Sequence, residues 1–410
     1  MKIQVFTIPF ILLILALGTG FSLLLNLFVV SVLVIIIGYL WTITGIKGIS
    51  GQIDDISDNY QVGDWFTEKT TVENDRWLPK VLLQVEEKSD LPGHNSAAFF
   101  NLAPKGSYSW QTEVFCRTRG MYSLGALKAT VAGPFGFFST SINFGVQRNL
   151  FVYPATLDIP NFQILSRNDL GRGSNQWLAS EAGPGASRVR EYSVGDTLNR
   201  IHWRSTAHAR KLMVKEFDAD DSSYSMKNIW VVLDMNRDSQ ATGRDSFTEE
   251  TGVTIAASLV KKYIDEEKEV GLIMSGDATD VFPPKTGGPH YWSMLKALTM
   301  IKASNGMAID QLLSTKIELF GDNPVVIVIT PSANDRLAAT LRQIRSRGAV
   351  IVTVLLDDSA SETGGGSVLR SGSLVSSGFQ VYTVKQGDPI DRALDSRAYI
   401  PAVRTAGNRV

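Results

Sequence analysis

The N-terminal sequence constrains this chain most, because no charged residue occurs between Lys2 and Lys47. A helix needs about 20 apolar residues to cross the hydrocarbon core of a membrane, so this run is long enough for two crossings. Residues 18–22 (Gly-Thr-Gly-Phe-Ser) interrupt the run with turn-compatible residues. We therefore predict a two-helix transmembrane hairpin anchor over residues 1–47. A cleaved signal peptide is the alternative, but polar sequence would then follow the first apolar stretch.

The lysines at the two ends of this run predict its orientation. Lys2 and Lys47 flank the hairpin, and the turn between the apolar stretches has no basic residue. Basic residues favour the cytoplasmic side of a membrane. The sequence therefore predicts a two-pass protein of the cell membrane, bound to the lipid bilayer, with cytoplasmic soluble domains. The single cysteine, Cys116, agrees with a reducing compartment.

The overall charge argues against one class of partner. The 410 residues include 40 Lys and Arg against 41 Asp and Glu, for a formal net charge of -1. Electrostatic binding to nucleic acid is unfavourable at this balance, so we expect no nucleic-acid partner. The mean hydropathy of +0.02 in a chain with 20% charged residues is explained by the apolar N-terminus.

Residues 48–160 have the pattern of short strands separated by turns. Val81, Leu83 and Val85 are apolar at alternate positions, as expected where one face of a strand is buried. Turn residues between such segments favour a β-sandwich-like domain. Cys116 is interpreted as a small buried apolar residue, since no histidine is near it in sequence. The expected strands are Thr67–Glu73, Lys80–Glu86, Trp110–Arg117, Ala126–Val131 and Leu150–Tyr153.

Residues 161–224 contain a segment dense in charge, which we interpret as a cationic linker motif. Between residues 188 and 217, seven Lys and Arg stand against three acidic residues, with aromatic residues among them. Such a segment can bind an anion, a phospholipid headgroup or the acidic face of a partner, and Arg204 beside Trp203 can stack on nucleobases. The alternative is structural, with charges of both signs pairing and locking the segment. The residues assigned to partner binding or to this structural motif are Arg190, Glu191, Tyr192, Asp196, Arg200, His202, Trp203, Arg204, Lys215 and Glu216.

This segment resembles the bacterial family named domain of unknown function 58. Upstream, residues 119–125 (Arg-Gly-Met-Tyr-Ser-Leu-Gly) and 134–138 (Pro-Phe-Gly-Phe-Phe) are similar to two further phrases of that family, although Gly133 replaces its usual Asp. The resemblance implies paired N-terminal spans, a von Willebrand factor A-like domain and partnership with MoxR-type AAA+ ATPases. The residues that carry it are Arg190-Glu191-Tyr192, Gly195-Asp196, Arg200-Ile201-His202-Trp203-Arg204, Ala207 and Lys215-Glu216-Phe217.

Residues 225–400 alternate strand and helix patterns, before a tail at 401–410. Residues 228–234 form an apolar run ending in Asp, as in a buried parallel strand. Capping boxes at Ser246 and at Ser332 are expected to begin two helices. This alternation predicts a doubly wound parallel sheet. The expected fold is α/β plus β: a transmembrane hairpin, a β-sandwich-like domain and a von Willebrand A-like α/β domain. Further strands are expected at 269–274, 324–329, 349–356 and 380–384, and a further helix at 289–303.

The carboxyl end of the first strand of this domain is the candidate metal site. Ligands of such sheets bind where the parallel strands end. Asp234, Asn236 and Asp238 offer three oxygen ligands there, which suit Mg²⁺. The resemblance implies serines at the last two positions, so the ligand set is degenerate. Thr286 is a further candidate ligand. The alternative is that Asp234 caps the strand end and the other two residues form turns.

These observations favour a membrane-anchored cytoplasmic adaptor over an enzyme. The four histidines have no metal-ligand spacing, and no Gly-x-Ser-x-Gly motif occurs. We therefore expect a non-catalytic protein without a resident cofactor, Mg²⁺ apart, that acts with a MoxR-type AAA+ ATPase. The alternative is a membrane-bound hydrolase or other enzyme that uses residues 190–217, where His202 and Asp196 would form an acid–base pair.

Overall fold

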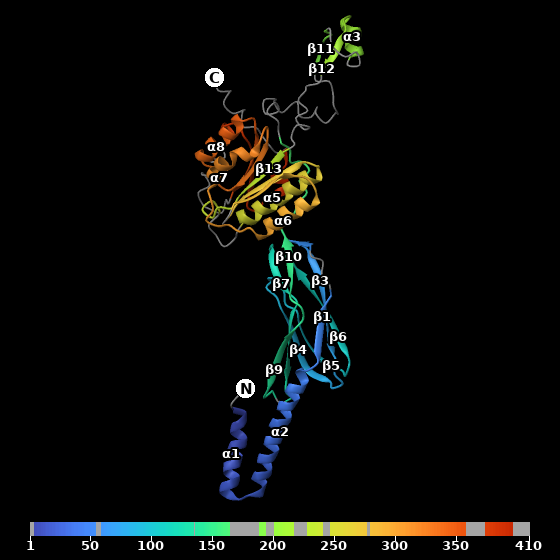
Figure 1. Ribbon diagram of the computed structural model, residues 1–410, viewed down its shortest axis with the longest axis vertical. Coiled ribbons are helices and arrows are strands. Elements are labelled where there is room, and N and C mark those ends of the chain that lie inside the picture. Colours follow the sequence, from blue (N-terminus) through green and yellow to red (C-terminus); the bar gives the residue numbers. More distant parts are fainter. Residues whose placement is uncertain are drawn as a thin grey trace. The chain divides into compact units, whose positions relative to one another are not determined.

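The computed structural model describes residues 4–54, 59–134, 136–164, 188–193, 201–216, 228–240, 247–276, 279–357 and 374–396 (Figure 1). The chain divides into two compact units, residues 1–155 and residues 156–410. The first unit contains the N-terminal helices and antiparallel sheets. The second contains a small hairpin module and a largely parallel sheet covered by helices. The protein is therefore a mixed α/β chain with several separate sheets.

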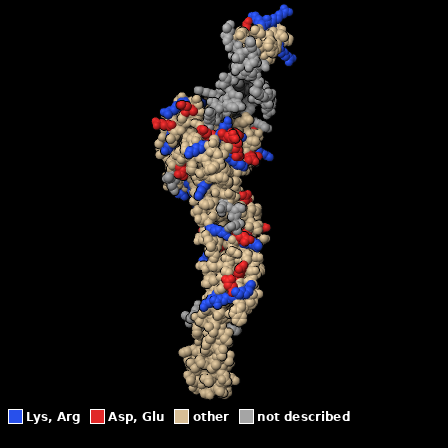
Figure 2. Space-filling view, turned by 45° about the vertical axis from the view of Figure 1, so that its right-hand side comes forward, with Lys and Arg blue, Asp and Glu red and all other residues tan. Residues whose placement is uncertain are grey.

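Two apolar helices begin the first unit. α1 (Gln4–Thr19) and α2 (Ser22–Ile46) pack against each other, and the connection between them includes Gly20 with a φ of +68°. Most of their large apolar side chains are exposed, and their surface in Figure 2 shows no Lys, Arg, Asp or Glu. α2 has the length and composition of a membrane span, whereas α1 is a shorter apolar helix. One N-terminal helix is therefore able to cross a membrane.

Ten strands make up the remainder of the described first unit, called the β domain here (residues 49–155). One sheet has the order β1-β3-β6 and another the order β5-β4-β8-β9, both antiparallel. In a third sheet, β10 pairs with β7 antiparallel and with β2 parallel. The five strands expected from sequence are present within a few residues. The bounds are β1 Ile49–Ile53, β2 Asn59–Gln61, β3 Trp65–Asn74, β4 Lys80–Lys88, β5 Ala97–Leu102, β6 Ser107–Phe115, β7 Gly120–Leu124, β8 Ala126–Ala132, β9 Ser139–Phe144 and β10 Arg148–Tyr153.

The interior of the β domain contains two apolar clusters. On β3, exposed and buried residues alternate, as expected for a strand with one inward face. Phe66 on this face belongs to one cluster and Val72 to the other, and Glu68 and Thr70 lie between them in the same buried row. Polar side chains therefore occupy the inner face between two apolar clusters. The first cluster is Phe66, Leu91, Val114, Cys116, Leu124, Leu150 and Val152, and the second is Ile46, Ile49, Val72, Leu83, Val85, Leu102, Leu127, Ala129 and Val131.

Lys80 fixes the end of α2 to the β domain. Its side chain is buried, and its Nζ donates hydrogen bonds to the carbonyl oxygens of Thr44 (3.1 Å) and Lys47 (2.7 Å). The last carbonyls of a helix have no partner within the helix, and a positive charge is favourable beside them. The rings of Tyr39 and Phe138 add an edge-to-face contact at 5.7 Å. The C-terminal end of α2 is therefore held by side chains of the β domain.

The second unit includes a small module around an antiparallel hairpin. β11 (Arg188–Glu191) pairs with β12 (Met213–Glu216), and α3 (Trp203–Ala209) lies between them in sequence. Ile201 and Val214 are buried and form an isolated bridge. The Thr206 hydroxyl accepts a hydrogen bond from the Met213 amide at 3.0 Å, which ties α3 to the hairpin. Residues 188–216 therefore have local structure of their own.

The rest of the second unit, the α/β domain (residues 228–396), is built on one sheet with the order β15-β14-β13-β16-β17-β18. Five strands are parallel, and β15 pairs antiparallel with β14. The central strands are buried on both faces, which explains their continuous apolar sequences. The bounds are β13 Asn228–Asp234, α5 Phe247–Asp265, β14 Glu269–Ser275, β15 Thr279–Lys285, α6 Gly288–Met300, α7 Ile309–Lys316, η4 Ile317–Phe320, β16 Val325–Thr330, α8 Asp335–Ser346, β17 Val350–Asp357, β18 Gln380–Lys385 and α10 Ile390–Ala393.

The α/β domain differs from the sequence-based expectations at the edge strand β15 and at the N-terminal cap of α8. The edge strand β15 was missed because Pro283 and Pro284 fall within it, and proline is tolerated only at a sheet edge or bulge. The cap of α8 was placed wrongly, since Asn334 rather than Ser332 accepts the Leu337 amide, at 2.7 Å. Asparagine is among the preferred N-cap residues. The capping residue expected for α5, Ser246, lies outside the described residues.

Candidate functional site

The predicted metal site lies where β13 ends at the carboxyl edge of the α/β sheet. The Asp234 side chain is 1% exposed. Its Oδ2 accepts a hydrogen bond from the Thr330 hydroxyl at 2.7 Å, and its Oδ1 accepts one from the Asn236 amide at 3.0 Å. Burial raises the pKa of the Asp234 carboxyl, and these hydrogen bonds oppose the rise. Both oxygens of the carboxylate therefore have partners within the protein.

The neighbouring candidates, Asn236 and Asp238, form a local turn. The Asn236 Oδ1 accepts the Asp238 amide at 2.9 Å, and its Nδ2 donates to the Gly306 carbonyl at 2.9 Å. The Asp238 residue is exposed, and so is Thr286, which follows β15. These are the turns that Asp and Asn side chains commonly form with the following backbone. The predicted ligands thus follow one another along the chain, and Mg²⁺ binding by them stays a prediction.

The cationic motif is organised around His202 and α3. The His202 Nδ1 accepts the Ser205 amide at 3.2 Å and lies 2.7 Å from the Ser205 hydroxyl, so this side chain caps α3. Trp203, the first residue of α3, is 69% exposed. Arg204 beside it is also exposed. Glu191 forms an ion pair with Lys211 at 3.1 Å, also within residues 188–217.

Other motif residues lie on the hairpin strands or next to them. Arg190 on β11 and Lys215 and Glu216 on β12 are in the hairpin, and the Tyr192 amide donates to the Leu212 carbonyl at 2.8 Å. The pairing of Asp196 with Arg200 or with His202 falls on residues outside those that the structure describes. Within the described part of the motif, His202 therefore caps α3, while the side chain of Trp203 stays exposed.

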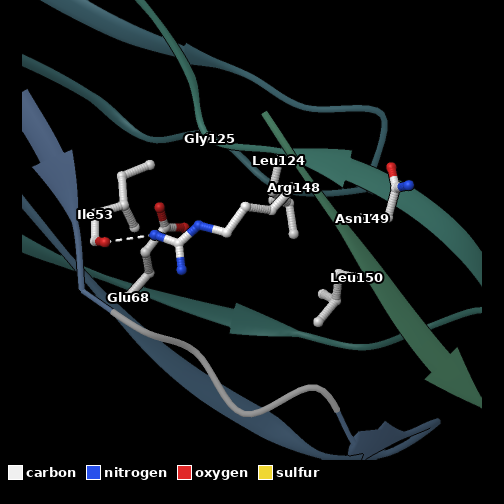
Figure 3. A pocket seen from close by; sticks show the side chains of 7 residues that line it. All are labelled: Ile53, Glu68, Leu124, Gly125, Arg148, Asn149 and Leu150. Carbon is white, nitrogen blue, oxygen red and sulfur yellow. Dashed lines mark hydrogen bonds between the residues drawn. The ribbon is translucent and has the colours of Figure 1, made fainter. Parts of the chain in front are cut away.

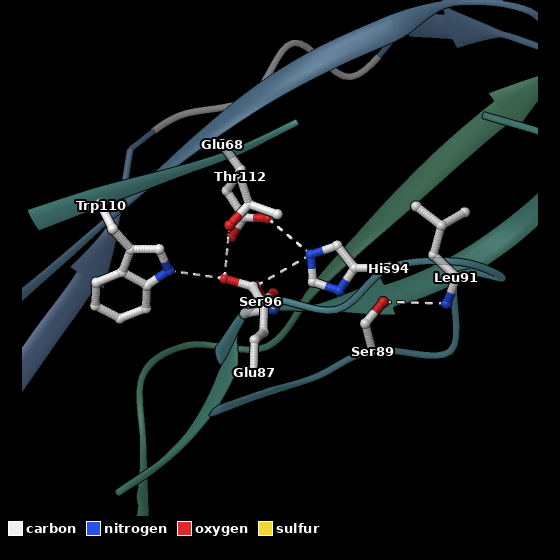
Figure 4. A network of polar contacts seen from close by, with 9 residues as sticks. Glu68, Glu87, Ser89, Leu91, His94, Ser96, Trp110 and Thr112 are labelled. Carbon is white, nitrogen blue, oxygen red and sulfur yellow. Dashed lines mark hydrogen bonds and ion pairs between the residues drawn. The ribbon is translucent and has the colours of Figure 1, made fainter. Parts of the chain in front are cut away.

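A polar cluster that sequence reasoning missed lies inside the β domain (Figure 4). In sequence, its glutamates fall between residues of the two apolar clusters. The His94 Nε2 lies 3.2 Å from the Glu68 Oε2 and 3.5 Å from the Glu87 Oε2. The side chain of His94 is 1% exposed and those of the two glutamates are 0% exposed. Glu68 is on β3, Glu87 is on β4, and His94 is in the connection from β4 to β5. We call Glu68, Glu87 and His94 the triad.

The two carboxyl groups of the triad are buried close together, which makes ionisation of both unfavourable. Burial raises the pKa of the Glu87 carboxyl to about 7, and the neighbouring Glu68 carboxyl raises it further, while the Gly125 amide and His94 oppose the rise. The Glu68 Oε1 and the Glu87 Oε2 are buried and have no hydrogen-bond partner. Among the described residues, these three form a group of potential ligands whose atoms lie within 4.8 Å of one another. No sequence signal joins them, because 26 residues separate Glu68 from His94.

Comparison with known proteins agrees with the resemblance over part of the chain. Residues 188–369 match the sequence model of a family described as "Protein of unknown function DUF58". The uncharacterized protein YeaD of Bacillus subtilis (strain 168) is 25% identical over 197 residues, which cover 48% of this chain and 46% of YeaD. The chain thus matches about half the length of this curated relative. The resemblance seen at residues 190–217 is therefore confirmed by a match that includes the motif and much of the α/β domain.

Two solved structures that match parts of this chain share only low similarity with it. A CARDB domain from Pyrococcus furiosus is 16% identical, with a TM-score of 0.20, and the match covers 26% of this chain and 94% of that domain. Proximal thread matrix protein 1 from the mussel byssus, in a form with a zinc-occupied MIDAS motif, is 15% identical, with a TM-score of 0.27. That match covers 32% of this chain and 38% of the mussel protein. Scores this low do not establish a shared fold.

Proposed function

We propose that this chain is a membrane-anchored, non-catalytic adaptor of the DUF58 family, which docks a partner protein at the cytoplasmic face of the membrane. The apolar surface of α2 supports the anchoring, and α1 would complete a two-pass hairpin. With Lys2 and Lys47 at its two ends, the hairpin would place the β domain and the second unit in the cytoplasm. The α/β domain would be of the von Willebrand A-like type that the family resemblance implies.

The exposure of Trp203 is the observation that carries the docking proposal. A tryptophan that is 69% exposed on a short helix leaves a large apolar surface in water. Tryptophan and arginine are enriched among the residues that dominate binding energy at protein interfaces, and Arg204 follows directly. The structural bonds of His202 and Thr206 fix α3 on its hairpin, so the exposed side chains start from an ordered backbone.

The charge of the module favours a partner with an acidic docking face. Its described and exposed side chains include Arg204, Arg210 and Lys211, against Glu191. Cationic residues around an aromatic anchor speed association with an acidic surface and orient the partner. The family resemblance makes a MoxR-type AAA+ ATPase the partner that we propose. The chain would recruit this ATPase to the membrane, and any turnover would occur on the partner.

Co-purification from membranes tests this function. The full chain carrying Trp203→Ala or Arg204→Glu would be compared with wild type for capture of the ATPase of the same organism. The matched control is Trp77→Ala, which removes a tryptophan that is 76% exposed in the β domain. We expect capture to fall at least about tenfold for the two module variants, as for loss of an interface anchor, and to stay unchanged for the control.

Two results would count against the adaptor. Equal capture by wild type and both module variants would remove the module from the interface. Turnover of a substrate by the purified chain without a partner, if it is lost on His202→Ala, would favour the enzyme alternative. Circular dichroism of each variant separates loss of binding from loss of folding.

A further inference from the structure

The position of the triad is unusual for charged residues, because it interrupts an apolar interior on three separate segments. On β3, Glu68 lies between Phe66 of one apolar cluster and Val72 of the other. On and after β4, Glu87 lies between Val85 and Leu91, which again belong to different clusters. Buried charges persist in proteins when they are paired, hydrogen-bonded or bound to a metal. The question is therefore which positive charge the two carboxylates share.

His94 alone does not balance these two carboxylates. A ring nitrogen carries at most one proton, so the Nε2 of His94 donates one hydrogen bond although two carboxylate oxygens lie within 3.5 Å of it. The Glu68 Oε1 and the Glu87 Oε2 have no hydrogen-bond partner despite full burial of both side chains. An unpartnered carboxylate oxygen in an apolar interior costs several kcal/mol or more. The Glu68 Oε2 and the Glu87 Oε2, which both lie within 3.5 Å of the His94 Nε2, are placed as ligand atoms would be.

From this arrangement we propose that the triad binds a divalent transition-metal ion, with Zn²⁺ as the chemical type. Imidazole nitrogen with carboxylate oxygen is a common zinc ligand set, whereas Mg²⁺ and Ca²⁺ prefer oxygen alone. Metal–ligand bonds of about 2.0–2.1 Å in a tetrahedron put neighbouring ligand atoms about 3.3 Å apart. The measured separations of 3.2 and 3.5 Å from His94 match that edge length.

The groups around the triad hold its ligands in place. The Gly125 amide donates a hydrogen bond of 2.6 Å to the Glu87 Oε1 and leaves Oε2 for the ion. Gly125 has a φ of +92°, and a Cβ there would lie 2.4 Å from the Val146 carbonyl oxygen, so only glycine fits. Hydrogen bonds to the ligands orient them in metal sites generally. Gly125 ends the phrase at 119–125, which thereby gains a physical role.

The connection that carries His94 is also fixed. The Ser89 hydroxyl accepts the Leu91 amide at 3.0 Å, and the Leu91 carbonyl accepts the His94 amide at 3.1 Å. The Glu87 amide donates to the Ser96 carbonyl at 2.9 Å, so the segment closes on itself. Because Glu68 and Glu87 come from different sheets, an ion bound to both would join the β1-β3-β6 sheet to the β5-β4-β8-β9 sheet.

A pocket adjoins the triad, because Glu68 is one of the residues that line it. The other lining residues are Ile53, Leu124, Gly125, Arg148, Asn149 and Leu150 (Figure 3). The Glu68 carboxylate also lies 3.2 Å from His94, so the pocket and the triad share this residue.

Metal titration of the full chain in detergent tests the proposal. The protein is stripped with EDTA, dialysed and titrated with ZnCl₂ by calorimetry, and its melting temperature is recorded. We expect one Zn²⁺ per chain and a rise in melting temperature of about 5 °C or more at a hundredfold excess over the dissociation constant. Glu68→Gln and His94→Gln are expected to weaken binding by about 100-fold or more. Glu73→Gln, on the exposed face of the same strand, is the matched control and should bind as wild type does.

The titration has outcomes that would overturn the proposal. Absence of Zn²⁺ binding by stripped wild type would show that the triad balances its charge by sharing protons. Binding that survives in both triad variants would place the ion elsewhere. If the variants do not fold, the absorption spectrum of Co²⁺ bound to wild type decides, since a tetrahedral site with an imidazole ligand is expected and an octahedral spectrum would contradict it.

Discussion

Two buried acidic sites in this protein differ in how their oxygens are satisfied. Asp234 of the α/β domain accepts hydrogen bonds at both oxygens from Thr330 and Asn236. In the triad of the β domain, the Glu68 Oε1 and the Glu87 Oε2 have no hydrogen-bond partner, although the His94 Nε2 lies 3.5 Å from the Glu87 Oε2. A carboxylate whose two oxygens both accept hydrogen bonds is stable without an ion, whereas two buried carboxylates that share few donors need a proton or a cation. Asp234, which the sequence predicts to be a metal ligand, therefore needs a cation less than the triad does.

The largest effect is expected at the glycine that supports the triad. Gly125→Ala adds a Cβ 2.4 Å from the Val146 carbonyl oxygen at a φ of +92°, so the backbone must move and the bond to Glu87 is lost. We expect the free energy of unfolding to fall by more than about 3 kcal/mol. Gly93→Ala is the control, because Gly93 has a similar φ of +84° with open space around it. A loss of about 1 kcal/mol is expected there. Equal losses in urea unfolding would show that Gly125 has no special role.

A smaller loss is expected when the satisfied carboxylate is changed. Asp234→Asn places an amide where the Thr330 hydroxyl or the Asn236 amide donates, so one buried hydrogen bond is lost. We expect a loss of about 2 kcal/mol in stability, with no change in Zn²⁺ stoichiometry. Asp238→Asn, at an exposed position, should change stability by less than about 0.5 kcal/mol. Loss of bound Zn²⁺ in the Asp234→Asn variant would mean that the ion binds at Asp234 rather than at the triad.

The metal-free triad is expected to make stability depend on pH. The pKa of Glu87 is raised to about 7 in the folded protein, above its ordinary value of 4.5. The unfolded chain therefore loses this proton first, and stability falls as the pH rises from about 4.5 to 7. Glu87→Gln keeps the hydrogen bond from Gly125 and cannot ionise. In EDTA-treated protein, we expect this variant to be more stable than wild type at pH 8 by on the order of 2 kcal/mol and equal to it near pH 4. Parallel pH curves for the two proteins would contradict the shift.

The smallest effect concerns the apolar cluster beside the triad. Cys116 in this cluster is buried, and desolvation and the charge of Asp64 raise the pKa of its thiol to about 11. Iodoacetamide reacts with the thiolate, so native Cys116 should react at least about 100-fold more slowly than in urea at pH 8. A native rate near the unfolded rate would mean that water enters the cluster, and the triad would then be less desolvated than its burial indicates.

The elements of the fold were predictable where the sequence pattern is local. Residues 228–234 form a strand because a buried parallel strand is apolar throughout, and that signal needs no partner. The short strands β2 and β7 lack such a signal, since their pairing depends on β10 far along the chain. The proline-containing β15 is stable only as the edge of a sheet already formed, which a local pattern does not reveal.

The same limit applies to the prediction of functional residues, as the two acidic sites show. Asp234, Asn236 and Asp238 were found because they follow one another at the end of a strand, yet their hydrogen bonds to Thr330 and Gly306 were not predictable. Glu68 lies within the strand expected at Thr67–Glu73, but no local sequence signal marks its side chain as buried. The pairing of β3 and β4 with different neighbours places it beside Glu87 and His94, and that depends on sheet topology.

The metal content of the triad is tested most directly by anomalous scattering from crystals of the full chain grown with Zn²⁺. We expect one anomalous peak between the Glu68 Oε2, the Glu87 Oε2 and the His94 Nε2, about 2.0–2.2 Å from each atom. We expect no Zn²⁺ peak beside Asp234. A peak at Asp234 with none at the triad would contradict the proposed site, because the ion would then prefer the carboxylate that already has its hydrogen bonds.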